Sequence, residues 1–468
     1  MSVKPVGAFA LVSLRKIWDE RTRSGVDLTS KFLRLGSVDD KTLTEVQHLQ
    51  LLGRSLRLEI KRLQKNQQPY IHLRQQERRN KEELSKAIDH YLVAVQTRLN
   101  QGIDPLRVEK GPMVGSPTAK QSFVLMAETY DLSVFIARIV NAELRSAFSL
   151  YSRSRHEITS ALVQTLRGNW NMRIVRTDIQ SFYESVEHKG LFAKLDGNRK
   201  LSPVTRNWIR QMFDSYSTIP GVAAGRGLPR GIGMSAALSE IYMKAFDQTI
   251  ASDTDCVFYG RYVDDIVVVY STSTASRPKE NYRLNYLKSA LESLRLTQTT
   301  DTTKNDEGPK DSNSFRFNYL GYEFKLVSSK EPQVIPGVSV DLSPERFRKI
   351  RKRLDLSFDL YRSGIPISAI QLERRIRLLT RNQKLHGAKS RVYSGLKSAN
   401  PLLTTNKQIR SLDNHLIKKI RGIAVNDPDL ATRLEKLTFE SGYQRSLTTH
   451  FSTRELAELT SAWRNQGA

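Results

Sequence analysis

Residues 257–270 read VFYGRYVDDIVVVY, and this stretch predicts the core of the fold. Two runs rich in β-branched and aromatic residues, Val257 to Arg261 and Ile266 to Tyr270, flank Asp264 and Asp265. The pattern indicates two strands joined by a tight turn. Adjacent carboxylates at the tip of a buried hairpin repel each other and lose hydration, and a divalent cation beside them relieves this cost. An ordinary Asp-Asp turn between two strands is the alternative.

A third carboxylate stands at the end of another predicted strand. Residues 173–183 read RIVRTDIQSFY, so that the β-rich run Met172 to Arg176 leads to Asp178 and then to two aromatic residues. An Asp just past a strand end can face the Asp264 and Asp265 hairpin on a neighbouring strand. Three carboxylates in this position could hold two Mg²⁺ ions about 3.5–4 Å apart, as in-line phosphoryl transfer requires.

The charge of the chain favours a polyanionic partner. Its 468 residues include 74 Lys and Arg against 48 Asp and Glu, a formal net charge of +26. Nucleic acid is the partner expected first for such a balance, with a solvated basic surface or an anionic membrane as the alternatives. The length predicts two or three structural units.

The positive charge is concentrated near one end of the chain. Residues 343–421 contain 20 Lys and Arg against 5 Asp and Glu, on predicted helices that also have apolar stripes such as Leu354, Phe358 and Tyr361. We expect this segment to grip a phosphate backbone, with a solvated helix face as the alternative. The basic residues expected to contact nucleic acid are Arg346, Lys349, Arg351, Lys352, Arg353, Arg374, Arg375 and Arg377.

The flanks contain few further signals. Cys256 is the single cysteine, which excludes an internal disulfide and a cysteine-rich zinc site and fits a reducing compartment. The apolar stretch Pro5 to Leu14 is short and is followed at once by basic residues, so it is interpreted as a buried first helix. The sequence has no run of about 18 apolar residues, so no membrane span is expected.

Periodicity outlines the remaining elements. Apolar residues at three- and four-residue spacing predict helices over Leu43 to Leu63 and Lys81 to Leu99. Glycine and proline between Gln101 and Thr118 predict a loop and a boundary. From about residue 120 to 340, helices alternate with short β-rich runs, and Asn318 to Leu326 is predicted as one further strand. Other predicted helices are Ser235 to Phe246 and Asn281 to Leu294, and the predicted loops are Gly308 to Ser314 and Ser328 to Gly337.

Four motifs in order give a specific resemblance. Asp178 in its strand, residues 227–235 (GLPRGIGMS), the hairpin YVDD and residues 317–322 (FNYLGY) resemble palm motifs A, B, C and E of reverse transcriptases in order and approximate spacing. The resemblance covers roughly residues 120–330. An ordered set of four motifs is far less accidental than any one of them.

The resemblance implies a fold and a division of the chain. It implies an α+β, right-hand polymerase fold with reverse-transcriptase fingers and palm, followed by a helical basic thumb and C-terminal helices. The expected domains are an N-terminal helical region at 1–118, fingers at 119–171, a palm with catalytic carboxylates at 172–340, a basic helical thumb at 343–421 and a C-terminal helical extension at 422–468.

Roles for the acidic residues also come from the resemblance. It implies that Asp178 and Asp264 bridge the metal ions with help from the backbone carbonyl of Ile179, and that Asp265 is a more peripheral ligand. Two Mg²⁺ ions are the expected cofactors, with Mn²⁺ as a substitute. A lysine near the position of Lys304 lies by the leaving phosphates in related enzymes and donates a proton; a solvated loop lysine is the alternative.

The resemblance also assigns a nucleotide site. Tyr183 matches the bulky residue that crowds a ribose 2′-hydroxyl, which implies a preference for deoxynucleotides, and Phe182 precedes it. Arg230 and Gly231 lie in a glycine-rich loop expected to support the template base and the incoming nucleotide, although many relatives have Gln where this chain has Arg230. Candidates for triphosphate contacts from the fingers are Arg138, Arg145, Arg153 and Arg155.

The flanks narrow the resemblance to bacterial defence-associated reverse transcriptases, which include the abortive-infection group. Residues 229–233, the run Ser181 to Val186 after Asp178, and Leu437 to Tyr443 carry this likeness. It implies a cytoplasmic RNA-directed DNA polymerase that uses dNTPs and acts in antiphage defence. The expected partners are an RNA template or associated noncoding RNA and the DNA product, with no membrane; a homo-oligomer stays open.

Three alternatives remain at this level. Members of that group are thought to extend DNA without a conventional template or to prime from a protein side chain, and tyrosines such as Tyr393 and Tyr443 have the necessary hydroxyl. A basic RNA-binding scaffold that has lost turnover is a second alternative, which the presence of all three carboxylates disfavours. An RNA-templated RNA polymerase is the third, which Tyr183 disfavours.

Overall fold

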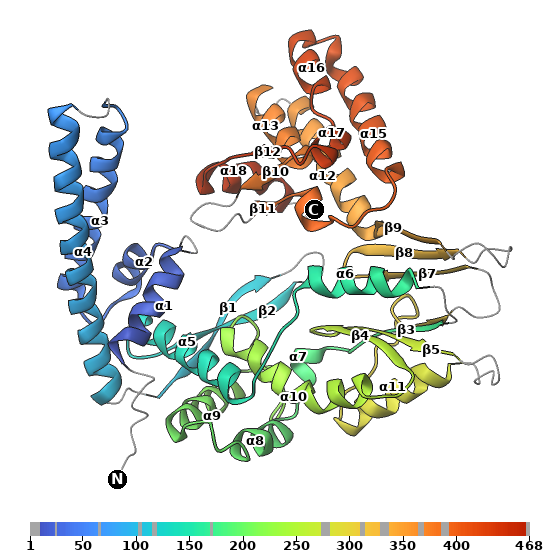
Figure 1. The fold of residues 1–468 in the computed structure, drawn as a ribbon, viewed down its shortest axis with the longest axis horizontal. Helices are drawn as coiled ribbons and strands as arrows, with labels where there is room; N and C mark the ends of the chain where they lie inside the picture. The colour runs from blue at the N-terminus through green and yellow to red at the C-terminus, as the bar shows by residue number, and fades with distance from the viewer. Residues whose placement is uncertain are drawn as a thin grey trace. The chain divides into compact units, whose positions relative to one another are not determined.

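A computed structural model of the protein describes residues 10–23, 26–63, 67–101, 105–114, 119–168, 172–272, 281–308, 314–327, 337–363, 369–384 and 393–464 (Figure 1). The chain forms two compact units. Unit 1 comprises Met1–Val114, Lys120–Tyr151 and Val186–Tyr242, and unit 2 comprises Gly115–Ala119, Ser152–Ser185 and Met243–Ala468.

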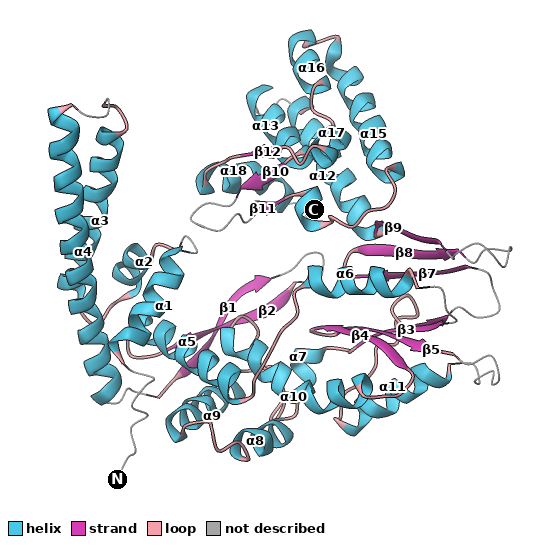
Figure 2. Cartoon of the chain, viewed as in Figure 1, coloured by secondary structure: helices cyan, strands magenta, loops and turns pink. Residues whose placement is uncertain are grey.

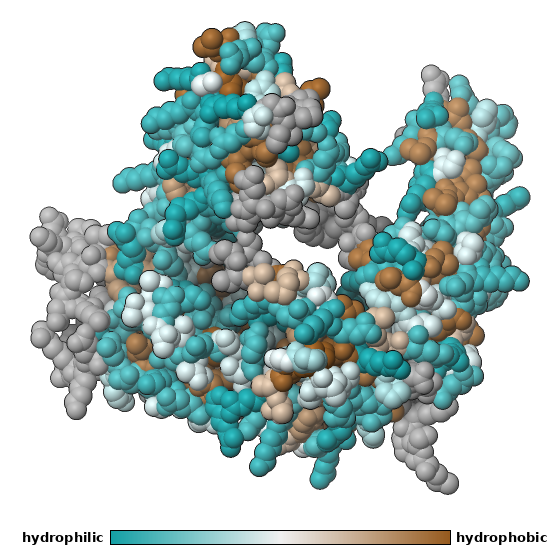
Figure 3. All heavy atoms as spheres, turned by 180° about the vertical axis from the view of Figure 1, so that it is seen from behind, coloured by the Kyte–Doolittle hydropathy of each residue, from teal (hydrophilic) through white to brown (hydrophobic). Residues whose placement is uncertain are grey.

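Unit 1 is mainly helical. Its helices are α1 (Leu11–Arg23), α2 (Leu28–Leu35), α3 (Asp40–Ile60), α4 (Gln68–Gln101), α5 (Tyr130–Ala147), α8 (His188–Asp196), α9 (Pro203–Ser217) and the first part of α10 (Gly233–Ala251). The long helices α3 and α4 form a hairpin, on which Figure 3 shows hydrophobic patches; Leu51, Leu52 and Leu58 of α3 are exposed. The predicted helices at Leu43 to Leu63 and Lys81 to Leu99 correspond to this pair.

The core of unit 1 includes a buried polar group. The rings of Trp18 and Tyr91 meet edge to face with centroids 5.6 Å apart. The Tyr91 hydroxyl donates to Asp131 Oδ2 at 2.5 Å, and Ser37 Oγ donates to the same oxygen at 3.0 Å. Burial, with the charge of Asp131 second, holds the pKa of Tyr91 well above its ordinary value. The network therefore satisfies a buried carboxylate and fixes α5 against α4.

One predicted loop is wrong. Within Gln101 to Thr118 the structure has strand β1 (Arg107–Val114), which pairs antiparallel with β2 (Lys120–Met126). Glycine and proline at 111 and 112 were interpreted as loop residues, but the register shifts between Lys110 and Met113. Such an irregularity accommodates both residue types, because it removes the need for regular pairing at those positions.

The central sheet of unit 2 places the predicted chemistry. Its strand order is β4-β5-β3-β6, formed by β3 (Met172–Asp178), β4 (Cys256–Tyr262), β5 (Asp265–Ser271) and β6 (Asp306–Gly308), all antiparallel to their neighbours. Helix α11 (Tyr282–Ser293) packs against β3 and β6, while α7 (Phe182–Ser185) follows β3. Isoleucine and valine side chains of β3 and β5 are fully buried, as their β-rich sequences predict.

A second sheet and one helix complete this core. Strands β7 (Ser314–Tyr319), β8 (Tyr322–Val327) and β9 (Gly337–Leu342) form a meander, and α6 (Arg155–Leu166) shares one hydrophobic cluster with both sheets (Figure 1). The single strand predicted over Asn318 to Leu326 is wrong, because Leu320 and Gly321 form a turn between β7 and β8. Both turn residues have positive φ, 46° and 77°, a conformation that ends a strand.

The C-terminal part of unit 2 is helical, apart from three short strands (Figure 2). Its helices are α12 (Pro344–Arg362), α13 (Ala369–Thr380), α14 (Leu396–Ala399), α15 (Lys407–Ala424), α16 (Pro428–Glu435), α17 (Phe439–Gln444) and α18 (Thr453–Arg464). The strands β10 (Asn382–Lys384), β11 (Tyr393–Ser394) and β12 (Thr448–Thr449) form a small sheet that the sequence did not predict.

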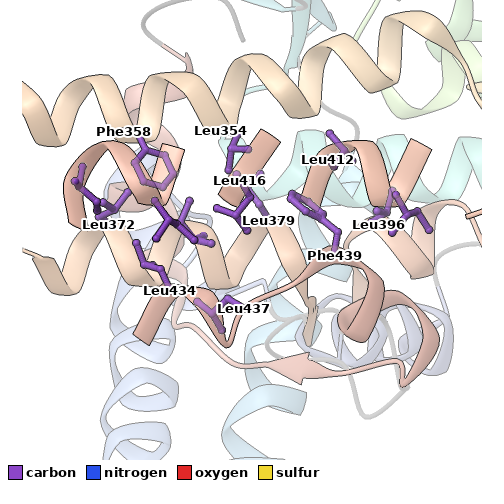
Figure 4. Close-up of a cluster of buried hydrophobic side chains, with 14 of the residues drawn as sticks. Leu354, Phe358, Leu372, Leu379, Leu396, Leu412, Leu416, Leu434, Leu437 and Phe439 are labelled. Carbon is purple, nitrogen blue, oxygen red and sulfur yellow. The ribbon is translucent and has the colours of Figure 1, made fainter. Parts of the chain in front are cut away.

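One apolar core joins these helices. Figure 4 shows side chains such as Leu354, Phe358, Leu416 and Phe439 pointing toward one another from different helices. Segments placed in the expected thumb and in the expected C-terminal extension contribute to the same cluster, which includes Trp463. Burial of this stripe explains why a strongly basic segment folds: the charged faces lie outside the apolar one.

The predicted α+β class is confirmed by this mixture of helices and sheets. The predicted helices at Ser235 to Phe246 and Asn281 to Leu294 correspond to α10 and α11. Most of the predicted loops at Gly308 to Ser314 and Ser328 to Gly337, and the first half of the apolar stretch at Pro5 to Leu14, lie outside the described residues. Within the described ranges no helix is both long and apolar enough to cross a membrane.

Candidate active site

Strand pairing brings the three acidic residues together. Asp178, the last residue of β3, stands opposite Asp265, the first residue of β5. Asp265 also pairs with Tyr262 of β4, so that Val263 and Asp264 form the two-residue turn of the hairpin. Two carboxylates from segments far apart in the sequence are thus direct cross-strand neighbours, with Asp264 next to one of them.

The turn at the tip is held in an unusual conformation. Val263 has φ 61°, in the left-handed region that β-branched residues rarely adopt. Its carbonyl accepts a hydrogen bond of 3.0 Å from Arg261 Nη1, and the same guanidinium makes two 2.7 Å bonds to Asp247. The backbone N–H of Ile179 donates to the carbonyl of Asp264 at 3.0 Å. These contacts clamp the turn against the end of β3.

A polar segment after α11 runs along the same strand end. The N–H of Thr299 donates to the carbonyl of Asp178 at 2.9 Å, and Thr177 Oγ1 donates to Asn305 Oδ1 at 2.7 Å. The next residues form β6, which pairs with β3 at Ile174 to Arg176. This anchoring positions Lys304, whose Nζ lies 3.0 Å from Asp178 Oδ2. The ammonium group of Lys304 therefore lies beside the predicted carboxylates, although the residue itself is in a turn.

Each carboxylate that faces the sheet edge has a cationic neighbour. Lys304 pairs with Asp178, while Arg176 Nη2 lies 3.5 Å from Asp265 Oδ1 and its Nη1 donates to the carbonyl of Thr303 at 2.8 Å. Among the residues that the structure describes, no three His, Cys, Asp or Glu side chains are gathered as a ready-made metal-binding group. The cations compensate the negative charge where a metal would otherwise do so.

Electrostatics show that the acidic side chains interact. Burial raises the pKa of Asp265 to about 6; Arg176 opposes this shift, and the negative charges of Asp178 and Asp264 add to it. Burial tends to lower the pKa of Lys304, but its hydrogen bond to Asp178 and the charges of all three carboxylates outweigh burial, so the pKa is raised. Three acidic groups therefore share one low-dielectric region that favours an added positive charge.

The donor set suits a hard divalent cation. Mg²⁺ prefers carboxylate and carbonyl oxygens, and the site offers the side chains of Asp178, Asp264 and Asp265 beside the backbone of Ile179. Repulsion among the carboxylates is the physical reason why such a cation would bind. The donor atoms of these residues are therefore those that Mg²⁺ prefers. Binding of the ion to Asp178 would require Lys304 to leave its ion pair with that carboxylate.

The two aromatic residues after Asp178 differ in accessibility. Phe182, which the sequence analysis placed in the nucleotide site with Tyr183, is only 2% exposed and packs in the core. Tyr183 is half-buried, and its ring meets that of Phe182 nearly at a right angle with centroids 5.9 Å apart. Phe182 thus packs against the ring of Tyr183, the residue predicted to lie beside the ribose.

The glycine-rich loop lies in unit 1. Its residue Gly231 has φ 99°, and a Cβ there would stand 3.0 Å from the carbonyl of Phe123. The carbonyl of Arg230 accepts a hydrogen bond of 2.6 Å from the N–H of Phe123. The loop therefore needs glycine both for its backbone conformation and for its close approach to β2. Gly231 also lines a cavity of about 430 Å³ together with Arg21 and Arg138.

The basic residues of α12 and α13 have different environments. Arg351 and Lys352 are exposed on α12, and Arg346, Lys349 and Arg353 line a cavity. On α13, Arg374 pairs with Glu455 at 3.3 Å, and Arg377 pairs with Glu373 at 2.5 Å.

The prediction that Arg375 contacts nucleic acid does not agree with its burial. Its side chain is 5% exposed, and its Nε donates to the carbonyl of Leu459 at 3.3 Å. Position 375 faces the core side of α13, next to the buried Ile376. The guanidinium holds α13 against α18, so we leave this residue out of the proposed nucleic-acid contacts.

Sequence reasoning missed Arg176 and Arg21. Arg176 is 6% exposed in the strand MRIVRTD, two residues before Asp178, and a charge so deeply buried usually has a partner. That signal was present in the sequence. Arg21 gave no comparable signal, because its place in the cavity with Arg138 depends on how α1 and α5 pack.

Part of the chain is similar to a known protein family. Residues 134–324 match the family described as reverse transcriptase (RNA-dependent DNA polymerase). A solved structure of apo telomerase from Candida tropicalis, truncated from its C-terminal domain, is similar at 12% identity and a TM-score of 0.33, over 58% of this chain and 70% of that one. No curated protein matches the sequence.

The matched segment contains Asp178, Asp264, Asp265 and Lys304. The chain therefore contains a reverse-transcriptase domain, as the motifs predicted. The matched domain belongs to the RNA-directed DNA polymerase class, which consists of nucleotidyltransferases.

Proposed function

We propose that this protein extends DNA with dNTPs on an RNA template, using two divalent cations held by Asp178, Asp264 and Asp265. The observation that carries the proposal is the direct pairing of Asp178 with Asp265 across β3 and β5, with Asp264 in the adjoining turn. The carbonyl of Ile179 is the proposed backbone ligand. When bound, the cations would activate the primer 3′-hydroxyl and neutralise the charge on the phosphates and the leaving pyrophosphate.

In the absence of a metal ion, Lys304 neutralises the negative charge of Asp178. Its ammonium lies 3.0 Å from Asp178 in the protein alone, and the anchored segment around it keeps it at the strand end. Once released from Asp178, the side chain has a proton to donate and remains within reach of the reacting groups. We propose that it donates this proton to the leaving pyrophosphate.

Selection of the sugar is assigned to Tyr183. Its ring is fixed by the buried Phe182 and follows Asp178 by one short turn. A rigid ring beside the sugar would exclude a 2′-hydroxyl and so favour dNTPs over rNTPs. Support for the template base and the nucleotide is assigned to the loop with Arg230 and Gly231, where glycine permits close backbone approach.

We also propose that the domain boundaries expected from the resemblance apply to this chain. Residues 119–171 are the fingers, 172–340 the palm and 343–421 the thumb, with helical segments at 1–118 and 422–468 on either side. We assign nucleic-acid contacts to Arg346, Lys349, Arg351, Lys352 and Arg353 of α12 and to the exposed Arg374 and the half-buried Arg377 of α13. Binding to the phosphate backbone is supported by the net charge of the chain, +26.

For the biological setting we propose bacterial antiphage defence in the cytoplasm, with an RNA template or an associated noncoding RNA. The support is the resemblance of residues 181–186, 229–233 and 437–443 to that group of reverse transcriptases. Untemplated or protein-primed synthesis is the variant of this proposal. Tyr443 is a poor priming residue, because it is 6% exposed and its hydroxyl donates to the carbonyl of Asn400.

A catalytically silent RNA-binding scaffold is the competing function, and one observation favours it. Both Asp178 and Asp265 are already compensated by cationic side chains, as a site that no longer binds metal would be. Retention of all three carboxylates close together speaks against it, because their mutual repulsion serves no structural purpose.

The test is primer extension on an RNA template with Mg²⁺, comparing dNTPs with rNTPs and with no template. Wild type should incorporate dNTPs, Asp264→Ala should not, and Asp214→Ala, which changes an exposed acidic residue of α9, should match wild type. Incorporation without template would select the untemplated variant. Absence of incorporation by wild type under every condition would leave the scaffold.

A further inference from the structure

Unit 2 contains a cavity of about 800 Å³ beside α12. Residues of α12 form one wall, and elements near the C-terminus, including α14 and α18, form others; the turn at Gly321 between β7 and β8 closes one end. The volume lies within the range of about 300–1,000 Å³ that is typical of small-molecule sites. A bare phosphate ion would fill only a small part of it.

Positive charge converges on one side of this cavity. Arg346, Lys349 and Arg353 line it, and Glu345 is the one carboxylate among the described lining residues. In the described part of the chain neither Arg346 nor Lys349 lies within ion-pair distance of a carboxylate. Burial, and after it the charge of Arg155, lowers the pKa of Arg346. Like charges held together in a half-buried place favour an anion among them.

Arg155 adds a further positive charge next to Arg346. Two guanidinium groups approach Gly321. A Cβ at this position would lie 2.8 Å from Nη2 of Arg155 and 3.2 Å from Nη1 of Arg346. Nε and Nη2 of Arg155 are buried and donate to no acceptor in the ranges described. Gly321, with φ 77°, thus lets two guanidinium groups share one turn.

The opposite walls are apolar. Trp463 is 3% exposed, and the guanidinium of Arg353 lies over its ring at 5.3 Å. Leu379, Leu396 and Leu456 add aliphatic surface, and Tyr393 adds a second aromatic side chain. A ligand that suits this cavity therefore has a charged end for the cations and a flat, weakly polar body for the apolar walls.

We propose that this cavity binds one nucleotide unit outside the polymerase centre, with its phosphate at Arg346 and Lys349 and its base against the apolar walls. The unit is either a free nucleotide or a nucleotide turned out of a bound strand, since both present the same phosphate and base. The proposal rests on the nucleic-acid role proposed for Arg346 and Lys349 and adds to it a cavity for one nucleotide; it does not require catalysis at Asp178, Asp264 and Asp265.

The experiment measures binding of ATP and of a single-stranded 12-nucleotide DNA by calorimetry in EDTA. EDTA withholds the cations that binding at the three carboxylates requires, so a failure of the proposed polymerase function leaves this measurement intact. Arg346→Gln and Lys349→Gln remove cavity charges, and the second residue is exposed, so its replacement leaves the fold unaffected. Arg348→Gln is the matched control, because Arg348 is exposed on the same helix and lies outside the cavity lining.

Loss of either cavity charge should weaken the Kd by about tenfold, whereas Arg348→Gln should leave it within about twofold of wild type. Ala399→Phe fills the cavity without changing charge and should weaken binding to a similar extent. Weakened ATP binding identifies a free nucleotide, and weakened binding of the oligonucleotide alone identifies a nucleotide of a strand. If wild type binds neither probe, if the three helix variants behave alike, or if Ala399→Phe binds normally, the proposal is wrong.

Discussion

Lys304 Nζ lies 3.0 Å from Asp178 Oδ2, so the lysine neutralises a carboxylate that we propose as a metal ligand. The pair joins a segment after α11 to the end of β3, two parts of the chain 126 residues apart. An ammonium that neutralises a carboxylate and is displaced by a divalent ion links metal binding to the position of a proton donor.

Replacing Lys304 by Met should separate these two roles. Loss of the competing ammonium should increase the stabilisation by Mg²⁺, measured as the rise in Tm on adding the ion, because Asp178 is then free to bind it. Loss of the proton donor should slow synthesis by about a hundredfold at saturating Mg²⁺. Lys288→Met, which changes an exposed lysine of α11, is the control. An unchanged rate would remove Lys304 from the reaction.

The three carboxylates should differ in their effects on activity and stability. Asp178→Ala and Asp264→Ala should both abolish primer extension. Their Tm values in EDTA should diverge, since Asp264→Ala relieves repulsion on Asp265, while Asp178→Ala leaves Lys304 without its ion pair. Asp265→Asn should keep measurable activity as the peripheral ligand. A large loss of Tm in Asp264→Ala would contradict this scheme.

The turn at Val263 should be a site of stored strain. A β-branched residue at φ 61° costs about 1–3 kcal/mol, and asparagine tolerates this conformation far better. Val263→Asn should therefore raise the free energy of unfolding in urea by about 1 kcal/mol. Val268→Ala, in the buried part of β5, should instead lower it by a comparable or larger amount. Destabilisation by Val263→Asn would mean that the turn is not strained.

His188 should make unit 1 sensitive to mild acid. Burial lowers its pKa below the ordinary value of about 6.5, although the bond from Nε2 to the carbonyl of Gly227, at 2.8 Å, opposes the shift. The unfolded chain takes up a proton near pH 6.5, whereas folded His188 resists it. Stability present above that pH is therefore lost as the pH falls toward the folded pKa. His188→Gln should show a smaller loss of Tm between pH 7.5 and 5.5, and an equal loss would contradict the assignment.

Two groups of basic residues in the C-terminal helices should respond differently to mutation. Reversal of Arg351 and Lys352 to Glu should weaken nucleic-acid binding and flatten its salt dependence, because each phosphate contact contributes about 0.7–0.9 to the slope of log K against log salt. Arg375→Met should lower Tm, since it removes the bond to the carbonyl of Leu459, and should leave the salt slope unchanged. A slope insensitive to the double reversal would refute the role of α12.

Local patterns in the sequence were sufficient for the hairpin of β4 and β5, the strand before Asp178 and the long helices, because alternation and helical periodicity are properties of neighbouring residues. They failed at β1, where Gly111 and Pro112 lie in an irregular strand, and at Leu320, where a turn interrupts a continuous β-rich run. In both places antiparallel pairing with the next strand along the chain, β2 or β8, overrides the local preference.

The amino-acid order thus predicted which residues carry the chemistry, since carboxylates at strand ends in four ordered motifs can be recognised without coordinates. Only the folded chain decided that Asp178 stands opposite Asp265, that Lys304 and Arg176 compensate them, and that Arg375 is buried while Arg346 faces a cavity. The reason is physical: strand register, burial and charge pairing join residues more than a hundred positions apart, and such contacts leave no periodic mark along the chain.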